Sequence, residues 1–207
     1  KYDGMYISHI RSEGNALLEA LDEFITIARK ANVTAELYHM KVAGQSNWHK
    51  LDAMVEKIEK ARAEGLKITA NMYTYTAGST GLDATVPPWA QEGGSAPFIT
   101  RLRNPEIRKR LLKEMTTPSD DWENLFLLSG SPENILIVGL KNSRLKHLNG
   151  RTLAEIAEIR GKSPAETAID LLAEDVSRVD AIYFFMSEEN IKKQIKLPWV
   201  SFCSDSP

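Results

Sequence analysis

The chain has 207 residues, of which 43% are hydrophobic and 26% are charged. This composition supports a globular core of ordinary size and excludes a disordered or fibrous protein. The formal net charge is -2, and the basic residues are scattered among the acidic ones, which argues against a nucleic-acid partner.

The first part of the chain alternates between strand-like and helix-like patterns. A strand ending at His9 is followed by residues 15–30, where apolar side chains recur at helical spacing. Residues 33–39 then predict a strand, residues 51–61 a second helix and residues 66–73 the next strand. These segments form two consecutive βαβ units, whose strands are parallel and end on the same side of the sheet.

Four predicted strands run into polar, reactive side chains. Three of these are His9, His39 and Tyr73, and the last strand, at 200–203, leads to Asp205. Strands that carry chemistry at their carboxyl ends, with helices between them, are typical of a (β/α) barrel enzyme. We therefore predict an α/β fold, a portion of a (β/α)8 TIM-type barrel, in which residues 1–207 form a single catalytic-domain fragment. His9, His39 and Tyr73 should share one rim.

A long segment at about 74–97 is rich in Gly, Ser, Thr and Pro and is predicted to be a lid or binding loop. The spacing of Thr152 with Glu155, and of Ser163 with Glu166, predicts two helices that begin with capping boxes. Other predicted elements are a helix at 107–115, strands at 124–128, 135–140 and 181–185, and a helix at 188–195.

The sequence also bears on location. No apolar run reaches the roughly 18 to 20 residues that a membrane span needs, and no signal-peptide pattern opens the chain, so we expect no membrane partner. Cys203 is the only cysteine, which excludes an internal disulfide framework and favours a cytoplasmic location. Because the chain starts at Lys1 without a methionine, almost directly in a strand, we expect a piece of a longer protein.

Several motifs follow one another in a characteristic order. They are GMYISHIRSEG at 4–14, YHMK at 38–41, NW at 47–48, YTYTAGST at 73–80, PPW at 87–89 and SD at 204–205. In this combination the chain resembles the D-aminoacylase, or N-acyl-D-amino-acid deacylase, family of the amidohydrolase superfamily. The resemblance spans nearly the whole chain and covers the later part of the catalytic barrel. It implies that the family's His-x-His strand and a further metal ligand lie upstream of Lys1.

The resemblance implies a site for one or two Zn²⁺ ions, with His9 and His39 as ligands and further ligands upstream. Catalytic zinc takes about three protein ligands and keeps a position for water. A single histidine of this kind would be better explained by hydrogen bonds at a strand end, but two at equivalent strand ends, inside matching motifs, favour metal ligands. His49 and His147 lie in polar stretches and are predicted to be surface residues.

Asp205 matches the family's catalytic aspartate, which takes a proton from water and returns it to the departing amine. Taken alone, Ser204-Asp205 would be better explained as a helix cap or a turn, and only the position of Asp205 after the final strand favours the catalytic role. The family usually has glycine where this chain has Cys203, and we expect the buried thiol of this cysteine to be inert.

The resemblance also implies a clamp for the free carboxylate of the substrate. Lys41, Tyr73 and Ser79 match its residues, and a cation with two hydroxyl donors suits an anion. Without the resemblance, the three would be explained as a surface lysine, a core tyrosine and a turn serine. Arg11 and Tyr75 are predicted to support the clamp from behind. Many relatives carry D-x-Y-P-Y where this chain has NMYTY, so substrate choice is expected to differ.

The predicted reaction is zinc-dependent hydrolysis of the amide bond of an N-acyl-D-amino acid, a small-molecule substrate, to a carboxylate and a free D-amino acid. Two alternatives stay open. One is hydrolysis of a cyclic amide such as a hydantoin or dihydropyrimidine, which lacks the free carboxylate. The other is a truncated, non-catalytic α/β fragment, because the strands counted here cannot close an eight-stranded barrel. By itself the fragment is expected to be inactive.

Overall fold

The computed structural model describes residues 4–205, which fall into two compact units. The first unit combines the chain up to Thr76 with the segment from Met186 onward, and the second unit runs from Ala77 to Phe185. Among the described residues, no helix is both long enough and apolar enough to cross a membrane. The single catalytic-domain fragment expected from the sequence stays a prediction.

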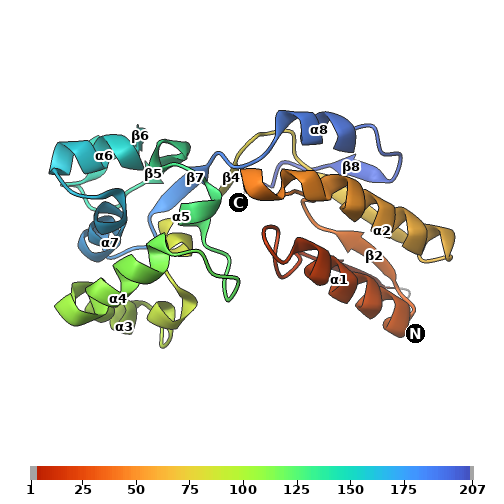
Figure 1. The fold of residues 1–207 in the computed structure, drawn as a ribbon, viewed down its shortest axis with the longest axis horizontal. Coiled ribbons are helices and arrows are strands. Elements are labelled where there is room, and N and C mark those ends of the chain that lie inside the picture. The colour runs from red at the N-terminus through yellow and green to blue at the C-terminus, as the bar shows by residue number, and fades with distance from the viewer. Residues whose placement is uncertain (1–3, 206–207) are drawn as a thin grey trace. The chain divides into compact units, whose positions relative to one another are not determined.

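The first unit is built on a four-stranded parallel sheet with the strand order β1-β2-β3-β8 (Figure 1). All four of the reactive strands expected from the sequence are present in it. They are β1 (Met5–Ser8), β2 (Thr34–Leu37), β3 (Ile68–Met72) and β8 (Val200–Phe202). Because the strands are parallel, their carboxyl ends lie along one edge of the sheet.

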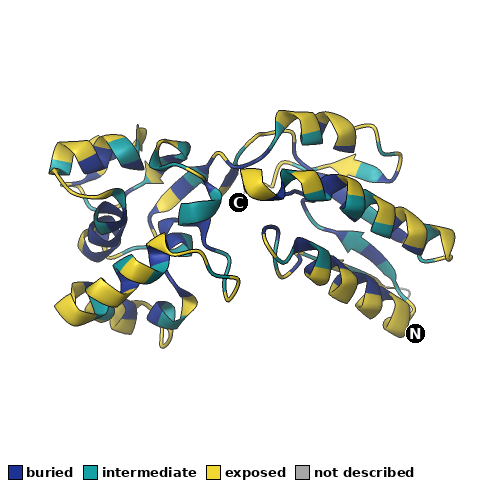
Figure 2. Cartoon of the chain, viewed as in Figure 1, coloured by how far each residue is buried: buried dark blue, intermediate teal, exposed yellow. Residues whose placement is uncertain are grey.

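Two long helices cover one face of this sheet, and their apolar sides form the core of the unit (Figures 1 and 2). The helices of the unit are α1 (Leu17–Ala31), α2 (Leu51–Ala63) and α8 (Glu188–Gln194), with a 3-10 turn, η1 (Gln45–Lys50). Four apolar residues spaced along α1 are all buried: Leu17, Leu21, Ile25 and Ala28. The helical periodicity of the sequence therefore identified the buried face.

The opposite face of the sheet leaves apolar side chains in contact with solvent. Tyr6 packs its ring against Phe24 of α1, and because side chains alternate along a strand, Met5 and Ile7 point the other way. Met5 is 55% exposed, Ile7 51% and Phe202, on β8, 64%. Such exposure is expected where a sheet forms only a portion of a barrel.

The second unit contains an antiparallel sheet with the order β4-β7-β5-β6. Its strands are β4 (Gly78–Gly81), β5 (Ile135–Gly139), β6 (Arg151–Thr152) and β7 (Asp180–Tyr183). Its helices are α3 (Ser95–Arg103), α4 (Pro105–Thr116), α5 (Leu125–Leu128), α6 (Leu153–Arg160) and α7 (Pro164–Asp175), and its 3-10 turns are η2 (Leu82–Thr85), η3 (Pro88–Gln91), η4 (Pro132–Asn134) and η5 (Lys146–Leu148).

Two expectations for this unit are wrong. The segment 74–97 is not one long loop, because it contains β4, η2, η3 and the start of α3. Strand β4 pairs with β7, about a hundred residues away, and a local sequence pattern cannot predict a partner at that distance. The strand predicted at 124–128 is instead helix α5 with its cap. The side chain of Asn124 accepts hydrogen bonds from the backbone N–H groups of Phe126 and Leu127 and so caps the helix, which begins at Leu125.

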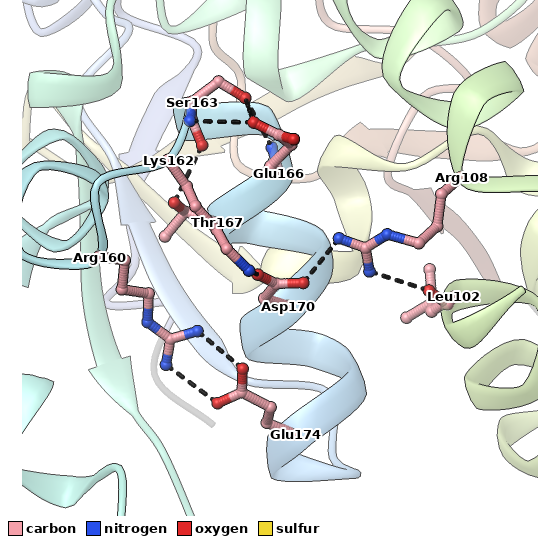
Figure 3. A network of polar contacts seen from close by, with 9 residues as sticks. All are labelled: Leu102, Arg108, Arg160, Lys162, Ser163, Glu166, Thr167, Asp170 and Glu174. Carbon is pink, nitrogen blue, oxygen red and sulfur yellow. Dashed lines mark hydrogen bonds and ion pairs between the residues drawn. The ribbon is translucent and has the colours of Figure 1, made fainter. Parts of the chain in front are cut away.

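Both predicted capping boxes are confirmed, at the starts of α6 and α7. In the second box the Ser163 hydroxyl accepts from the backbone N–H of Glu166, while the Glu166 carboxylate accepts from that of Ser163 (Figure 3). One turn further along α7, the Asp170 carboxylate forms two ion pairs. Its Oδ1 lies 2.6 Å from the guanidinium of Arg108, and its Oδ2 lies 2.5 Å from the ammonium of Lys162. This shared carboxylate ties α4 and the start of α7 together.

Candidate functional site

Two histidines meet at the carboxyl edge of the parallel sheet. His9 directly follows β1, His39 lies two residues after β2, and Nδ1 of His9 is 3.1 Å from Nε2 of His39. The side chain of His9 is about half exposed and that of His39 is buried. The predicted shared rim is confirmed for this pair. His49 and His147 are exposed, as predicted.

Glu13 lies beside the two histidines, and the sequence analysis did not predict it as a site residue. Its Oε1 lies 3.3 Å from Nδ1 of His9, 3.1 Å from Nδ1 of His39 and 2.7 Å from Nζ of Lys41. In the part of the chain that the structure describes, His9, Glu13 and His39 are the three potential metal ligands whose donor atoms all lie within 4.8 Å of one another. We call these three residues the histidine–glutamate cluster.

Glu13 was missed because a glutamate in a short loop is usually solvated. Here it is buried, with 8% of the residue exposed. Its backbone carbonyl accepts a hydrogen bond from the N–H of Ala43 at 2.8 Å, which ties the loop after β1 to the chain that follows Lys41. The sequence feature that could have identified it is the motif at 4–14, in which Glu13 stands four residues after His9.

A side chain on β3 holds the buried histidine in place. The backbone of His39 is left-handed, with φ of 39°, a conformation that a non-glycine residue adopts at some cost. Its N–H donates to Oδ1 of Asn71 at 2.6 Å, and Nδ2 of Asn71 donates to Glu36 at 2.6 Å. The amide of Asn71 therefore accepts a hydrogen bond through its oxygen and donates one through its nitrogen.

The surroundings of Glu13 favour the ionised form of its carboxylate. Burial raises the pKa of Glu13, but hydrogen bonds from His39 and His9 and the charge of Lys41 outweigh it and hold the pKa well below its usual range. Burial, followed by the charges of Glu13 and Asp205, raises the pKa of Tyr73, so its hydroxyl stays protonated. Nζ of Lys41 lies 5.3 Å from the centroid of the Tyr73 ring.

Asp205 lies outside the histidine–glutamate cluster. It is exposed, with φ of 50°, and its charge contributes to the raised pKa of Tyr73. Cys203 is half-buried rather than buried, burial raises the pKa of its thiol, and its Sγ lies 3.2 Å from Oδ1 of Asn71. The catalytic role of Asp205 stays a prediction.

The other predicted substrate residues are spread more widely. Arg11 forms a two-point ion pair with Glu23 of α1 at 2.8 and 2.9 Å, on the exposed surface. Tyr75 is 62% exposed, and its ring centroid is 5.9 Å from that of Tyr73. Ser79 belongs to β4 of the second unit, where its hydroxyl donates to a backbone carbonyl of β7 at 3.4 Å. The roles of Arg11, Tyr75 and Ser79 stay predictions.

The donor atoms of the cluster fit a zinc ion. Two imidazole nitrogens and a carboxylate are a donor set that zinc accepts, with bonds to nitrogen of about 2.0–2.1 Å. Since Nδ1 of His9 and Nε2 of His39 are 3.1 Å apart, both can reach one ion at that bond length. The arrangement can therefore bind a divalent metal at the edge where the predicted substrate residues Lys41 and Tyr73 also lie.

Comparisons with known proteins point to one group of enzymes. No family model matches the chain. The N-acyl-D-glutamate deacylase of Alcaligenes xylosoxydans xylosoxydans is 36% identical over 76 residues, which cover 37% of this chain and 16% of that protein. The D-aminoacylase of the same organism is 27% identical over 192 residues, which cover 93% of this chain and 29% of that protein. The chain thus spans less than a third of either relative.

Solved structures agree. The N-acyl-D-glutamate deacylase from Bordetella bronchiseptica, complexed with zinc and a phosphonate mimic of the tetrahedral intermediate, has a TM-score of 0.66 and 22% identity, covering 97% of this chain and 32% of that one. A D-aminoacylase described as defining a novel subset of amidohydrolases has a TM-score of 0.65 and 26% identity, covering 98% of this chain and 32% of that one. The predicted resemblance is confirmed, as is the α/β fold of part of a TIM-type barrel.

Proposed function

We propose that the protein is a metal-dependent amidohydrolase that cuts the linear amide bond of N-acyl-D-amino acids, giving a carboxylate and a free D-amino acid. The observation that carries this proposal is the approach of His9 and His39 to 3.1 Å at the carboxyl edge of a parallel sheet. The substrate class is supported by the names of the two curated relatives, an N-acyl-D-glutamate deacylase and a D-aminoacylase.

We propose Zn²⁺ as the metal, bound by His9 and His39 together with ligands outside the described residues. The solved relative complexed with zinc supports this ion, and a D-aminoacylase structure that concerns a binuclear metal centre leaves room for a second one. A zinc ion at this position would polarise the scissile carbonyl and make the attacking water more acidic. Within the chain, the buried position of His39 keeps its imidazole from turning into solvent.

The remaining steps fall to the chain's own side chains. Asp205 accepts a proton from the attacking water and delivers it to the amine nitrogen as the C–N bond breaks. The substrate carboxylate is held by the ammonium of Lys41 and by the hydroxyl of Tyr73, and the expected contribution of Ser79 stays a prediction. The raised pKa of Tyr73 supports its part, because only a protonated hydroxyl can donate a hydrogen bond. With a single cysteine, a cytoplasmic location is proposed as well.

The metal site is tested by elemental analysis of the protein at its full natural length, including any segments that flank residues 1–207. The wild type should retain zinc through dialysis, whereas His9→Ala and His39→Ala should lose most of it. His49→Ala and His147→Ala are matched controls, because both histidines are exposed, and they should retain the metal. A wild type that holds no zinc, or a His39→Ala variant that holds as much as the controls, contradicts the proposal.

Substrate class is tested with three compounds on the metal-loaded wild type: an N-acetyl-D-amino acid, its methyl ester and a hydantoin. The free acid should be the best substrate, and esterification should lower kcat/KM by about 10- to 100-fold, because a charge-assisted contact with the carboxylate is lost. Faster turnover of the hydantoin would identify a cyclic-amide hydrolase and overturn the proposal. So would a lack of activity towards all three compounds.

A further inference from the structure

Gln194 is a buried polar residue that no step of the proposed reaction uses. It is the last residue of α8, and only 3% of it is exposed. It lies on the same side of the helix as the buried Ile191, three positions earlier, where an apolar residue would be the usual choice. Burying an amide is unfavourable unless the amide is hydrogen-bonded. The hydrogen-bond partner of Gln194 therefore indicates what this residue is for.

That partner lies between two residues of the candidate site. Nε2 of Gln194 donates a hydrogen bond to the backbone carbonyl of Met40 at 3.1 Å. Met40 stands between His39 and Lys41, in the described segment 39–43, which is buried and is neither helix nor strand. A buried backbone carbonyl outside regular structure needs a partner from elsewhere in the fold. Helix α8 supplies it from 154 positions away in the sequence.

The hydrogen bond acts on the peptide group from which Lys41 starts. Because a peptide group is planar, the carbonyl oxygen of Met40 and the N–H and Cα of Lys41 move together. On its other side, Met40 donates its own N–H to the backbone carbonyl of Asn71 at 2.7 Å. With both backbone groups of Met40 held, the point at which the side chain of Lys41 leaves the backbone is set.

Lys41 depends on such placement because its ammonium ends among close partners. Its Nζ lies 2.7 Å from Oε1 of Glu13 and 2.5 Å from Nδ1 of His39, and the side chain is only 6% exposed. The ring centroid of Tyr73 is 5.3 Å away. A substrate carboxylate has to meet this ammonium where it stands, and a misplacement of about 1 Å can impair a site strongly.

We infer that Gln194 is a positioning residue, which holds the carbonyl of Met40 and so places the ammonium of Lys41 for the carboxylate of the substrate. This inference rests on the proposed function, in which Lys41 binds that carboxylate. The proposed metal ligand His39 is held by a different contact, since its N–H donates to Oδ1 of Asn71 at 2.6 Å. Loss of the Gln194 hydrogen bond should thus impair carboxylate recognition and leave metal binding intact.

The first test compares an N-acetyl-D-amino acid with its methyl ester on metal-loaded protein at its full natural length. Gln194→Met keeps a similar size but cannot donate. It should lower kcat/KM for the free acid by about 10-fold, mainly by raising KM, and change that for the ester by less than about twofold. Elemental analysis should find as much zinc as in the wild type. An unchanged rate for the acid, equal losses for acid and ester, or a loss of zinc overturns the inference.

Asn190→Leu is the matched control. Asn190 lies on the same helix, and its Nδ2 donates to the backbone carbonyl of Trp48 at 2.9 Å. The variant removes the same kind of hydrogen bond without touching the peptide group of Lys41, so the preference for the acid over the ester should stay as in the wild type. A loss of preference as large as in Gln194→Met would show that any damage to α8 has this effect, which overturns the inference.

A crystal structure of metal-free Gln194→Met reads the placement without any turnover. The carbonyl of Met40 should have turned, and Nζ of Lys41 should be displaced by about 1 Å or more. Both groups in their wild-type positions overturn the inference. If Gln194→Met does not fold, Gln194→Ala replaces it in every measurement with the same expected results, because its smaller side chain leaves room for a water that can donate to the carbonyl without fixing it.

The two proposals fail differently. A wild type that hydrolyses neither compound ends the proposed function, while the crystal structure of the variant still decides whether Gln194 places Lys41. A wild type that prefers the acid, together with a Gln194→Met variant that keeps this preference in full, ends only the inference about Gln194.

Discussion

The ammonium of Lys41 lies 2.7 Å from a carboxylate oxygen of Glu13, and the two side chains are only 6% and 10% exposed. They are 28 positions apart in the chain and meet because the segments that follow β1 and β2 leave the same edge of the sheet. Both charges have given up their hydration, so each depends on the other for compensation.

Removing only the lysine should therefore be costly. We expect Lys41→Met to lower the free energy of unfolding by about 3–5 kcal/mol, because it leaves the Glu13 carboxylate buried with one partner fewer. Urea denaturation at neutral pH measures this. Lys57→Met, which breaks an exposed pair with Asp22, is the control and should cost less than about 1 kcal/mol. Similar losses in both variants would show that the Glu13–Lys41 pair is not buried as described.

Asn71 should stabilise the turn that carries His39. Asn71→Leu keeps a similar size but leaves the buried N–H of His39 without its acceptor, so we expect a loss of about 1–3 kcal/mol in the free energy of unfolding. Ser201→Ala on the neighbouring strand removes a longer hydrogen bond of 3.4 Å from an exposed residue and should stay within about 0.5 kcal/mol of the wild type. Urea denaturation of both variants compares them, and an Asn71→Leu variant as stable as the control would refute this role.

The shared carboxylate of Asp170 should make the second unit sensitive to acid. Burial raises the pKa of Asp170, but hydrogen bonds from Lys162 and Arg108 outweigh it, so the folded pKa lies below the ordinary value of 3.8 (Figure 3). A lowered pKa contributes stability that is complete above the unfolded value and is lost as the pH falls through the folded value.

Asp170→Asn removes this contribution. The difference in unfolding free energy between wild type and variant should be about 1–3 kcal/mol at neutral pH and should shrink as the pH falls below about 4. Urea titrations across this range measure it, with Glu158→Gln, an exposed residue of α6, as the control. A difference that stays constant from neutral pH down to about pH 2 would contradict the assignment.

Helix α7 offers a test of its capping box. Ser163→Ala removes the acceptor for the N–H of Glu166 and should lower the free energy of unfolding by about 0.5–2 kcal/mol. Ser163→Gly should lower it by only a few tenths, roughly, because glycine suits the backbone of a cap and lets water reach the N–H groups. Thermal denaturation distinguishes the variants. If the glycine variant proved the less stable of the two, the cap would not be the source of the effect.

Local patterns were sufficient wherever the partner of a residue lies within a few positions. The apolar spacing of α1 and α2 and the two capping boxes follow from interactions over three or four residues, and the structure agrees with them. The same reasoning failed at Asn124, whose side chain caps a helix in an apolar segment that was predicted to be a strand. It also failed at β4, because its partner strand β7 lies far away in the sequence.

For the candidate site, the sequence by itself determined which imidazoles stand at strand ends, because parallel strands bring their carboxyl ends to one edge. Only the tertiary structure decided what surrounds them. Glu13 and Asn71 have residue types that are usually solvated, and they became partners of His39 because a loop and a neighbouring strand buried them beside it. Burial and hydrogen-bond direction depend on how separate segments pack, and the order of residues along the chain does not record that packing.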